Sequence, residues 1–96
     1  MSQNNRKQLD ALKGMQSFLS RYCLELTDKL TDYIEWINKL SPAGVEDHVV
    51  KKIDNEFRPQ ITKHINSVID SIEGEQLKLI RDSMIPLEDY LSRFGG

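Results

Sequence analysis

The stretch Ser41-Pro42-Ala43-Gly44-Val45 decides the fold, because it is the one Pro-x-Gly in a sequence that has helical periodicity on both sides. Pro42 disfavours the helical conformation at the residue before it, so a preceding helix is expected to end at Leu40. Gly44 permits a positive φ, which completes a tight turn. Pro42 and Gly44 therefore predict a turn, residues 41–44, between two antiparallel helices.

Upstream of this turn, apolar residues recur in alternating steps of three and four, the heptad pattern of packed helices. The pattern predicts one helix over residues 4–40. Only Gln16 interrupts the apolar series, and Gly14 weakens the helix by about 1 kcal/mol. Met15, Phe18, Tyr22, Ile34 and Trp36 widen the stripe, which favours a bundle over a strict coiled coil. The heptad positions are Leu9, Leu12, Gln16, Leu19, Cys23, Leu26, Leu30, Tyr33, Ile37 and Leu40.

Downstream of the turn, a second helix is predicted over residues 45–94, with apolar steps that are often four residues long. Kinks or breaks in this helix are expected near Pro59, Gly74 and Pro86. One long kinked helix is favoured over three separate helices. The predicted helices would be about 55 Å and about 70 Å long. The last residues of the second helix must therefore pack on another chain, fold back or be mobile.

A chain of 96 residues with 39% hydrophobic and 29% charged residues is expected to form one domain, residues 1–96. The fold class predicted is all-α: an antiparallel helical hairpin with a long kinked second helix. Two helices leave apolar surface exposed, so dimerisation into a four-helix bundle is expected.

The charge pattern and the apolar segments exclude several kinds of partner. The net charge is −2, and no stripe of basic and aromatic residues suggests nucleic-acid binding. No signal peptide and no apolar run of membrane-spanning length are found, which predicts no membrane insertion. We expect a cytoplasmic protein that, if it is secreted, leaves the cell without a cleaved signal peptide.

Residues that could carry chemistry are few. Cys23, the single cysteine, rules out an internal disulfide and is expected to be buried. His48 and His64 are too far apart in sequence for a metal-binding pair, and His64 is expected to be partly buried. No phosphate loop, nucleophile motif or dinucleotide fingerprint occurs. The sequence therefore predicts no enzyme, with no catalytic residue, cofactor, metal or small-molecule substrate.

The layout resembles the WXG-type substrates of type VII secretion systems. Two helices, a central glycine-bearing turn and a length near one hundred residues carry the resemblance, and Val50, Ile53, Phe57 and Pro59 are similar to that family's pattern after the turn. Pro42-Ala43-Gly44 stands where the family has Trp-x-Gly, so the tryptophan is missing. The family's C-terminal Tyr-x-x-x-Asp/Glu is also missing, since Phe94 follows Tyr90. The resemblance implies a hairpin that dimerises into a four-helix bundle and is exported folded.

The favoured interpretation is a non-enzymatic helical protein–protein interaction domain, either a WXG-like secretion substrate or its partner, that forms a homodimer or a heterodimer with another helical protein. A cytoplasmic adaptor or chaperone that binds a client helix, with residues 84–94 as its docking element, is an alternative. A filament-forming secretion subunit is another. In the favoured interpretation, the interface residues are Leu19, Leu26, Leu30, Tyr33, Trp36, Ile37, Ile53, Phe57, Ile61, Ile65 and Ile72, each worth about 1.5–3 kcal/mol on full burial.

Overall fold

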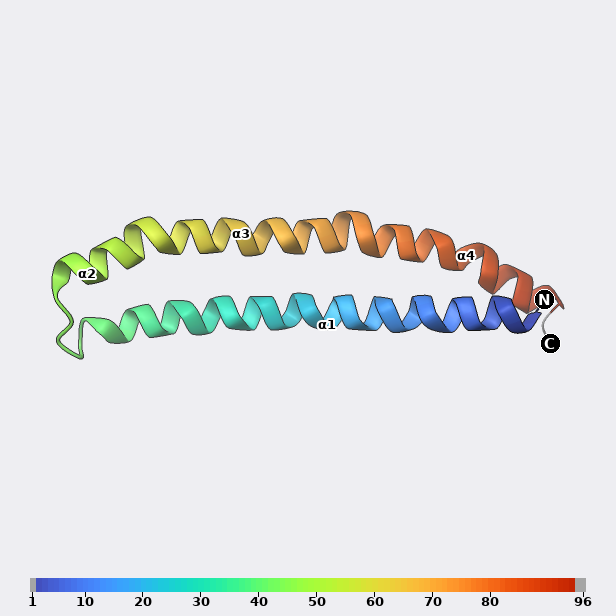
Figure 1. Cartoon of the computed structure of the whole chain (residues 1–96), viewed down its shortest axis with the longest axis horizontal. Coiled ribbons are helices and arrows are strands. Elements are labelled where there is room, and N and C mark those ends of the chain that lie inside the picture. Colours follow the sequence, from blue (N-terminus) through green and yellow to red (C-terminus); the bar gives the residue numbers. More distant parts are fainter. Residues whose placement is uncertain (1, 95–96) are drawn as a thin grey trace. The chain divides into compact units, whose positions relative to one another are not determined.

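The computed structural model describes residues 2–94, and within this range it contains helices and turns but no strand. The all-α prediction is therefore confirmed. The first element, α1, runs without interruption over Ser2–Leu40. After the turn come five consecutive helical segments (Figure 1). They are α2 (Asp47–Lys52), the π-helical segment η1 (Ile53–Phe57), α3 (Arg58–Ser71), the π-helical segment η2 (Ile72–Gln76) and α4 (Leu77–Phe94).

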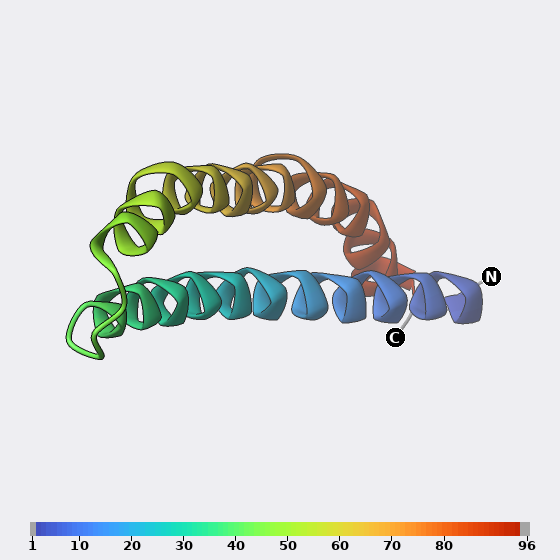
Figure 2. The same cartoon turned by 60° about the vertical axis from the view of Figure 1, so that its left-hand side comes forward.

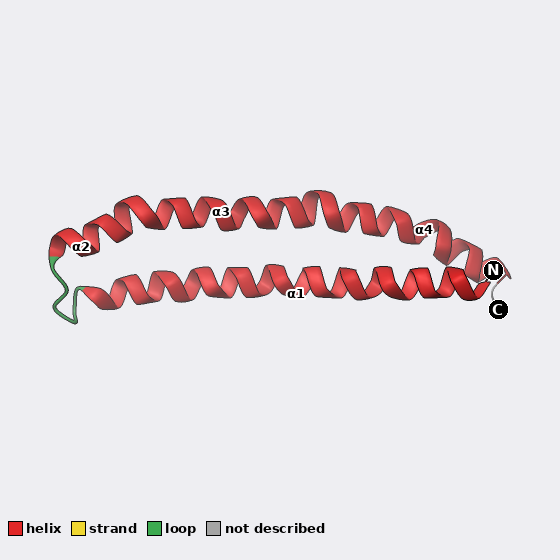
Figure 3. Ribbon diagram, in the orientation of Figure 1, coloured by secondary structure: helices red, strands yellow, loops and turns green. Residues whose placement is uncertain are grey.

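The chain divides into two compact units, each made of two helical stretches. Unit 1 joins α1 up to Tyr22 to the chain from Asp70 onward, and unit 2 is the continuous segment Cys23–Ile69. In unit 1 the first part of α1 and the helix α4 run side by side in opposite directions (Figures 1 and 2). Unit 2 is a hairpin in which the loop coloured green in Figure 3 connects the end of α1 to α2.

The turn of unit 2 is a Schellman motif with Gly44 at its C′ position. The Val45 N–H donates to the Leu40 carbonyl at 3.1 Å, and the Gly44 N–H donates to the Ser41 carbonyl at 3.0 Å. This pair of bonds needs a left-handed residue, and Gly44 has a φ of +89°. Val45 and Leu40, the residues expected to make the apolar contact of the motif, are both half-buried. Gly44 therefore serves the turn by its backbone conformation.

Two π-helical turns interrupt the second helical region, each marked by a backbone bond that spans five residues. The Arg58 N–H donates to the Ile53 carbonyl, and the Leu77 N–H donates to the Ile72 carbonyl. The first π turn directly precedes Pro59, whose ring would crowd the carbonyl four residues earlier in an ordinary α-helix. The second contains Gly74. The helical backbone thus continues past both residues with a widened turn, and it continues through Pro86 inside α4.

The buried side chains are few and come mostly from unit 1. Leu9 and Leu19 of α1 are buried there together with Ile72, Ile80 and Met84. The last helix therefore packs within its own chain, alongside the first part of α1 and without folding back on itself, so none of the three outcomes expected for residues 84–94 is the one observed. In unit 2 only Cys23 and Ile37 are buried, both from α1, and the stretch from Val45 to Ile69 contributes half-buried side chains at best.

Candidate interaction surface

The heptad positions of α1 form a continuous inner seam. All ten residues predicted for it are buried or half-buried, including the polar Gln16. The prediction that Cys23 is buried is confirmed. His64, in contrast, is exposed, so the expectation of a partly buried histidine is wrong. His64 directly precedes the half-buried Ile65, and neighbouring residues of an α-helix point in directions about 100° apart. The His64 side chain therefore points toward solvent.

The predicted interface residues fall into three groups by exposure. Leu19, Ile37 and Ile72 are buried inside the chain and are not accessible to a partner. Half-buried positions between the two helical stretches of a unit hold Leu26, Leu30, Tyr33, Ile53 and Ile65. Trp36, Phe57 and Ile61 are exposed, with Trp36 at 64% and Phe57 at 43%. Only this third group, all in unit 2, is available on the surface.

The Trp36 ring makes a contact with a side chain of its own helix. The Lys39 ammonium lies 4.5 Å from the centroid of the indole ring, an exposed cation–π pair within the last turns of α1. On the other helical stretch of unit 2, the inward positions are partly polar. Arg58 donates to Asp54 at 2.8 Å, and both side chains are about half-exposed. Because these polar residues take the inner positions, Phe57 and Ile61 are left to the side of the seam.

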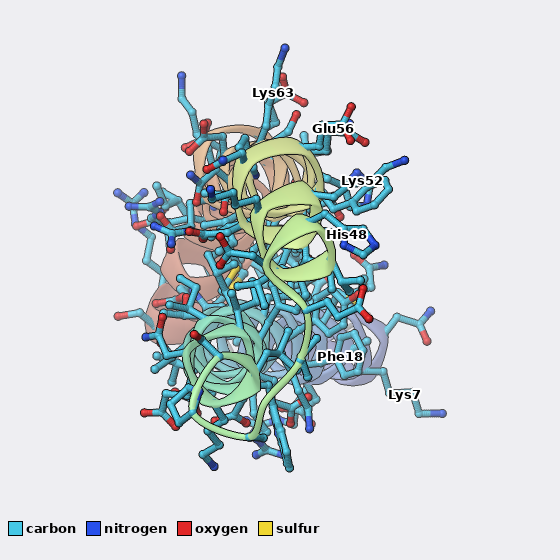
Figure 4. The ribbon with its side chains drawn as sticks, turned by 90° about the vertical axis from the view of Figure 1, so that its left-hand side faces the viewer. Lys7, Phe18, His48, Lys52, Glu56 and Lys63 are labelled. Atoms are coloured by element: carbon cyan, nitrogen blue, oxygen red, sulfur yellow. The ribbon has the colours of Figure 1, made fainter. Side chains whose placement is uncertain are left out.

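A second exposed apolar group lies on α1 in unit 1, and we call it the Phe18 stripe. It consists of Met15, Phe18 and Tyr22, at steps of three and four that keep them on one side of the helix. Phe18 is 59% exposed, and its ring stacks on that of Tyr22 with centroids 6.0 Å apart. Figure 4 shows the side chains of Phe18 and Lys7 pointing to the same side of α1. The sequence pattern predicts these residues only as a widening of the core stripe.

Each residue of the Phe18 stripe directly precedes a seam residue, and α4 has side chains at equivalent places. Leu79, Pro86 and Tyr90 directly precede Ile80, Leu87 and Leu91, which are buried or half-buried. Two antiparallel helices are related by a two-fold axis perpendicular to their common plane, so residues with the same offset lie on the same face of the pair. The Phe18 stripe and these three α4 residues therefore share one face of unit 1, which we call the stripe face.

The two helical stretches of unit 1 carry opposite charge. Four basic residues and Asp10 give the chain up to Tyr22 a net side-chain charge of +3, and six acidic and three basic residues give the chain from Asp70 onward −3. The ion pairs of the described residues are all local. In unit 1 the pair is Arg93–Asp89 at 3.4 Å, within α4. The basic residues are Arg6, Lys7, Lys13 and Arg21, and the acidic ones are Asp70, Glu73, Glu75, Asp82, Glu88 and Asp89.

Ligand-binding chemistry is sparse in the part of the chain that the structure describes. No group of three or more His, Cys, Asp or Glu side chains there is placed to hold a metal ion. His48 has the exposed Glu46 carboxylate 3.2 Å from its Nδ1 atom, and Figure 4 shows it projecting outward. None of the helices between residues 2 and 94 is both long and apolar enough to span a bilayer. The most distinctive surface feature is thus the exposed apolar side chains.

Comparison with known proteins gives no relative. No protein-family model, curated protein or solved structure matches the chain.

Proposed function

We propose that this chain is a non-enzymatic helical protein–protein interaction domain that binds a helical partner through the stripe face of unit 1. One observation carries the proposal: Met15, Phe18 and Tyr22 form an uninterrupted apolar stripe on the surface. Single exposed apolar residues are ordinary on a protein surface, but a contiguous group rimmed by charge is typical of an interaction site. Tyrosine and other aromatic residues are also enriched among the residues that dominate binding energy.

The geometry supports a helical partner in particular. Side chains at steps of three and four present ridges that fit the grooves of another α-helix. Burial of a Phe or Met side chain stabilises a complex by about 1.5–3 kcal/mol before the costs of association. Trp36, Phe57 and Ile61 of unit 2 are further candidates for the same kind of contact. The partner is either a second copy or another helical protein, and a four-helix bundle is the product in both cases.

In its narrower form, the proposal is a WXG-like chain that is a type VII secretion substrate or the partner of one. A helical hairpin closed by a glycine-dependent turn supports this form, and the missing tryptophan at position 42 weighs against it. For the adaptor or chaperone alternative, the burial of Met84 is unfavourable, because a docking element in residues 84–94 would have to leave the core of unit 1. We therefore place binding on the stripe face.

Site-specific photo-crosslinking in the cell that produces the protein tests the function. The photoreactive residue p-benzoylphenylalanine replaces Phe18 in one variant and the exposed Ser20 in a control, because Ser20 directly follows the seam residue Leu19 and lies on the opposite edge. We expect an adduct from position 18 and none from position 20, and mass spectrometry identifies the protein attached. If position 18 gives no protein adduct, or both positions give the same adducts, the stripe face is not a binding surface.

A further inference from the structure

We infer that the partner on the stripe face is a second copy of this chain, packed so that α1 of one copy lies against α4 of the other. This inference rests on the proposed function and names its partner. Two features of unit 1 carry it: the arrangement of charge on either side of the stripe face, and the absence, among the described residues, of ion pairs between the two helical stretches.

The charges beside the stripe are mainly of one sign on each helix, and the exception on α4 is Arg93, seven residues after Pro86, which pairs with Asp89. Lys7 and Arg21 lie next to the Phe18 stripe, fourteen residues apart and so on the same side of α1. On the second stretch, Glu75 and Asp82 flank the exposed Leu79. The stripe face therefore has a basic rim, Lys7 and Arg21, along α1 and an acidic rim, Glu75 and Asp82, along η2 and α4.

The charged side chains of the two rims have no ion-pair partner among the described residues. Among the described residues, none of Lys7, Arg21, Glu75 and Asp82 takes part in an ion pair, and all four are exposed. An apolar face with opposite charge on its two sides is complementary to itself. If a second copy is turned about a two-fold axis parallel to the helices, the basic rim of each copy meets the acidic rim of the other.

The charges also select between the two symmetric ways of stacking this face. A two-fold axis across the helices would set α1 against α1, with basic rim on basic rim and acidic on acidic. An axis along them sets α1 against α4 twice, so that each basic rim lies along an acidic rim. An axis along the helices keeps each residue at its own height, so the Phe18 stripe, at the end of unit 1 where the stretch from Asp70 begins, packs at the level of Leu79 of the other copy. Pro86 and Tyr90 then pack beside the first turns of α1, and each copy contributes two helical stretches to a four-helix arrangement.

Gly14 is consistent with close packing at this face. It lies four residues before Phe18 on α1, and a Cβ atom added there would meet nothing within 4 Å in the chain itself. The space beside the glycine is therefore open to a side chain from another molecule.

Sedimentation equilibrium of charge-reversal variants tests the inference. We expect the wild-type chain to dimerise at micromolar concentrations in low salt and less tightly in high salt. The basic-rim variant Lys7→Glu/Arg21→Glu and the acidic-rim variant Glu75→Lys/Asp82→Lys should each dimerise about tenfold more weakly or worse, since four exposed charge contacts become repulsive in the dimer. An equimolar mixture of the two variants should regain wild-type affinity, because both of its interfaces are again complementary.

A matched control separates the rim from net charge. Arg6→Glu/Lys13→Glu changes the charge of α1 by the same amount, but both residues directly follow half-buried positions and lie on the opposite edge. We expect this control to dimerise like the wild-type chain, with circular dichroism showing equal helicity in all variants. A wild-type monomer at high micromolar concentration would overturn the inference. So would a basic-rim variant no weaker than the control, or a mixture no tighter than its components.

The crosslinking experiment at position 18 distinguishes failure of the second-copy inference from failure of the proposed function on which it rests. An adduct with a second copy supports both. Attachment to a different protein alone retains the interaction domain and overturns the second-copy inference, whereas the absence of any adduct contradicts both.

Discussion

Two adjacent residues of α4 give the sharpest test of the packing in unit 1. Ile80 is 8% exposed and Leu79 is 68% exposed, although their side chains are the same size. We expect Ile80→Ala to lower the free energy of unfolding by about 3 kcal/mol, within the range for buried Ile-to-Ala changes. Leu79→Ala should change it by less than about 0.5 kcal/mol, because its side chain contacts mainly solvent in the single chain.

The effect of Ile80→Ala is a large fraction of the total stability. A domain of this size is stabilised by roughly 5–15 kcal/mol, and the buried side chains of the described residues are only Leu9, Leu19, Cys23, Ile37, Ile72, Ile80 and Met84. For a domain of about 100 residues, each kcal/mol corresponds to roughly 4–8 °C, so a fall in Tm of about 12–24 °C follows.

Thermal and urea unfolding, followed by circular dichroism, measure both variants. The measurements should be repeated at several protein concentrations, because association adds a concentration-dependent contribution to stability. At the lowest concentration Leu79→Ala should match the wild-type chain, and at high concentration it should lose the part of the stability that dimerisation supplies. If the two variants unfolded at the same temperature, the placement of Ile80 inside and Leu79 outside the core would be refuted.

Three further predictions concern the turn, the cysteine and the uneven core. Gly44→Ala should lower the free energy of unfolding by about 1–2 kcal/mol, because Gly44 has a positive φ. Gly14→Ala, at a helical glycine without a positive φ, should raise the free energy of unfolding of the monomer by about 1 kcal/mol in urea unfolding. If both substitutions changed the free energy of unfolding in the same direction, the Schellman turn would be contradicted. Cys23 should react with a thiol reagent only slowly in the folded chain and rapidly in urea, and fast labelling without denaturant would show that it is not buried. Amide hydrogens of residues 47–69, a stretch without a buried side chain, should exchange faster than those of residues 77–94, and the opposite order would show that unit 2 is the more stable.

The sequence was most informative where periodicity and turn chemistry agree. The heptad of α1 correctly identified the inner seam, because a buried stripe on a regular helix leaves a regular pattern of apolar residues. Gly44 was identifiable for a similar reason, since few residues can take a positive φ. The second helical region was harder. Its apolar residues include Phe57 and Ile61, which a helical wheel places in the core, whereas Asp54 and Arg58 take the inner positions and pair with each other.

The candidate surface could be recognised only in part. Met15, Phe18 and Tyr22 stand out in the sequence as extra apolar residues beside the seam, but the pattern cannot show whether such residues thicken a core or remain exposed. That outcome depends on whether a third helix covers them, and the described chain supplies none. Leu79 left no signal, because a single leucine beside a seam is common. Trp36 was expected in an interface and is exposed in the monomer, which leaves that expectation a prediction.

The π turn at residues 72–76 changes what the length of this stretch means. Ile72 and Leu77 are five residues apart, a spacing that puts two side chains on different sides of an α-helix but on the same side when a π turn lies between them. Loss of one codon from this stretch would close the π turn into an ordinary α-helix and leave the apolar side of α4 facing as before, because four residues in an α-helix return a side chain to the same side as five residues across a π turn. The π turn therefore accommodates one additional residue within the helix without changing which side of α4 is apolar.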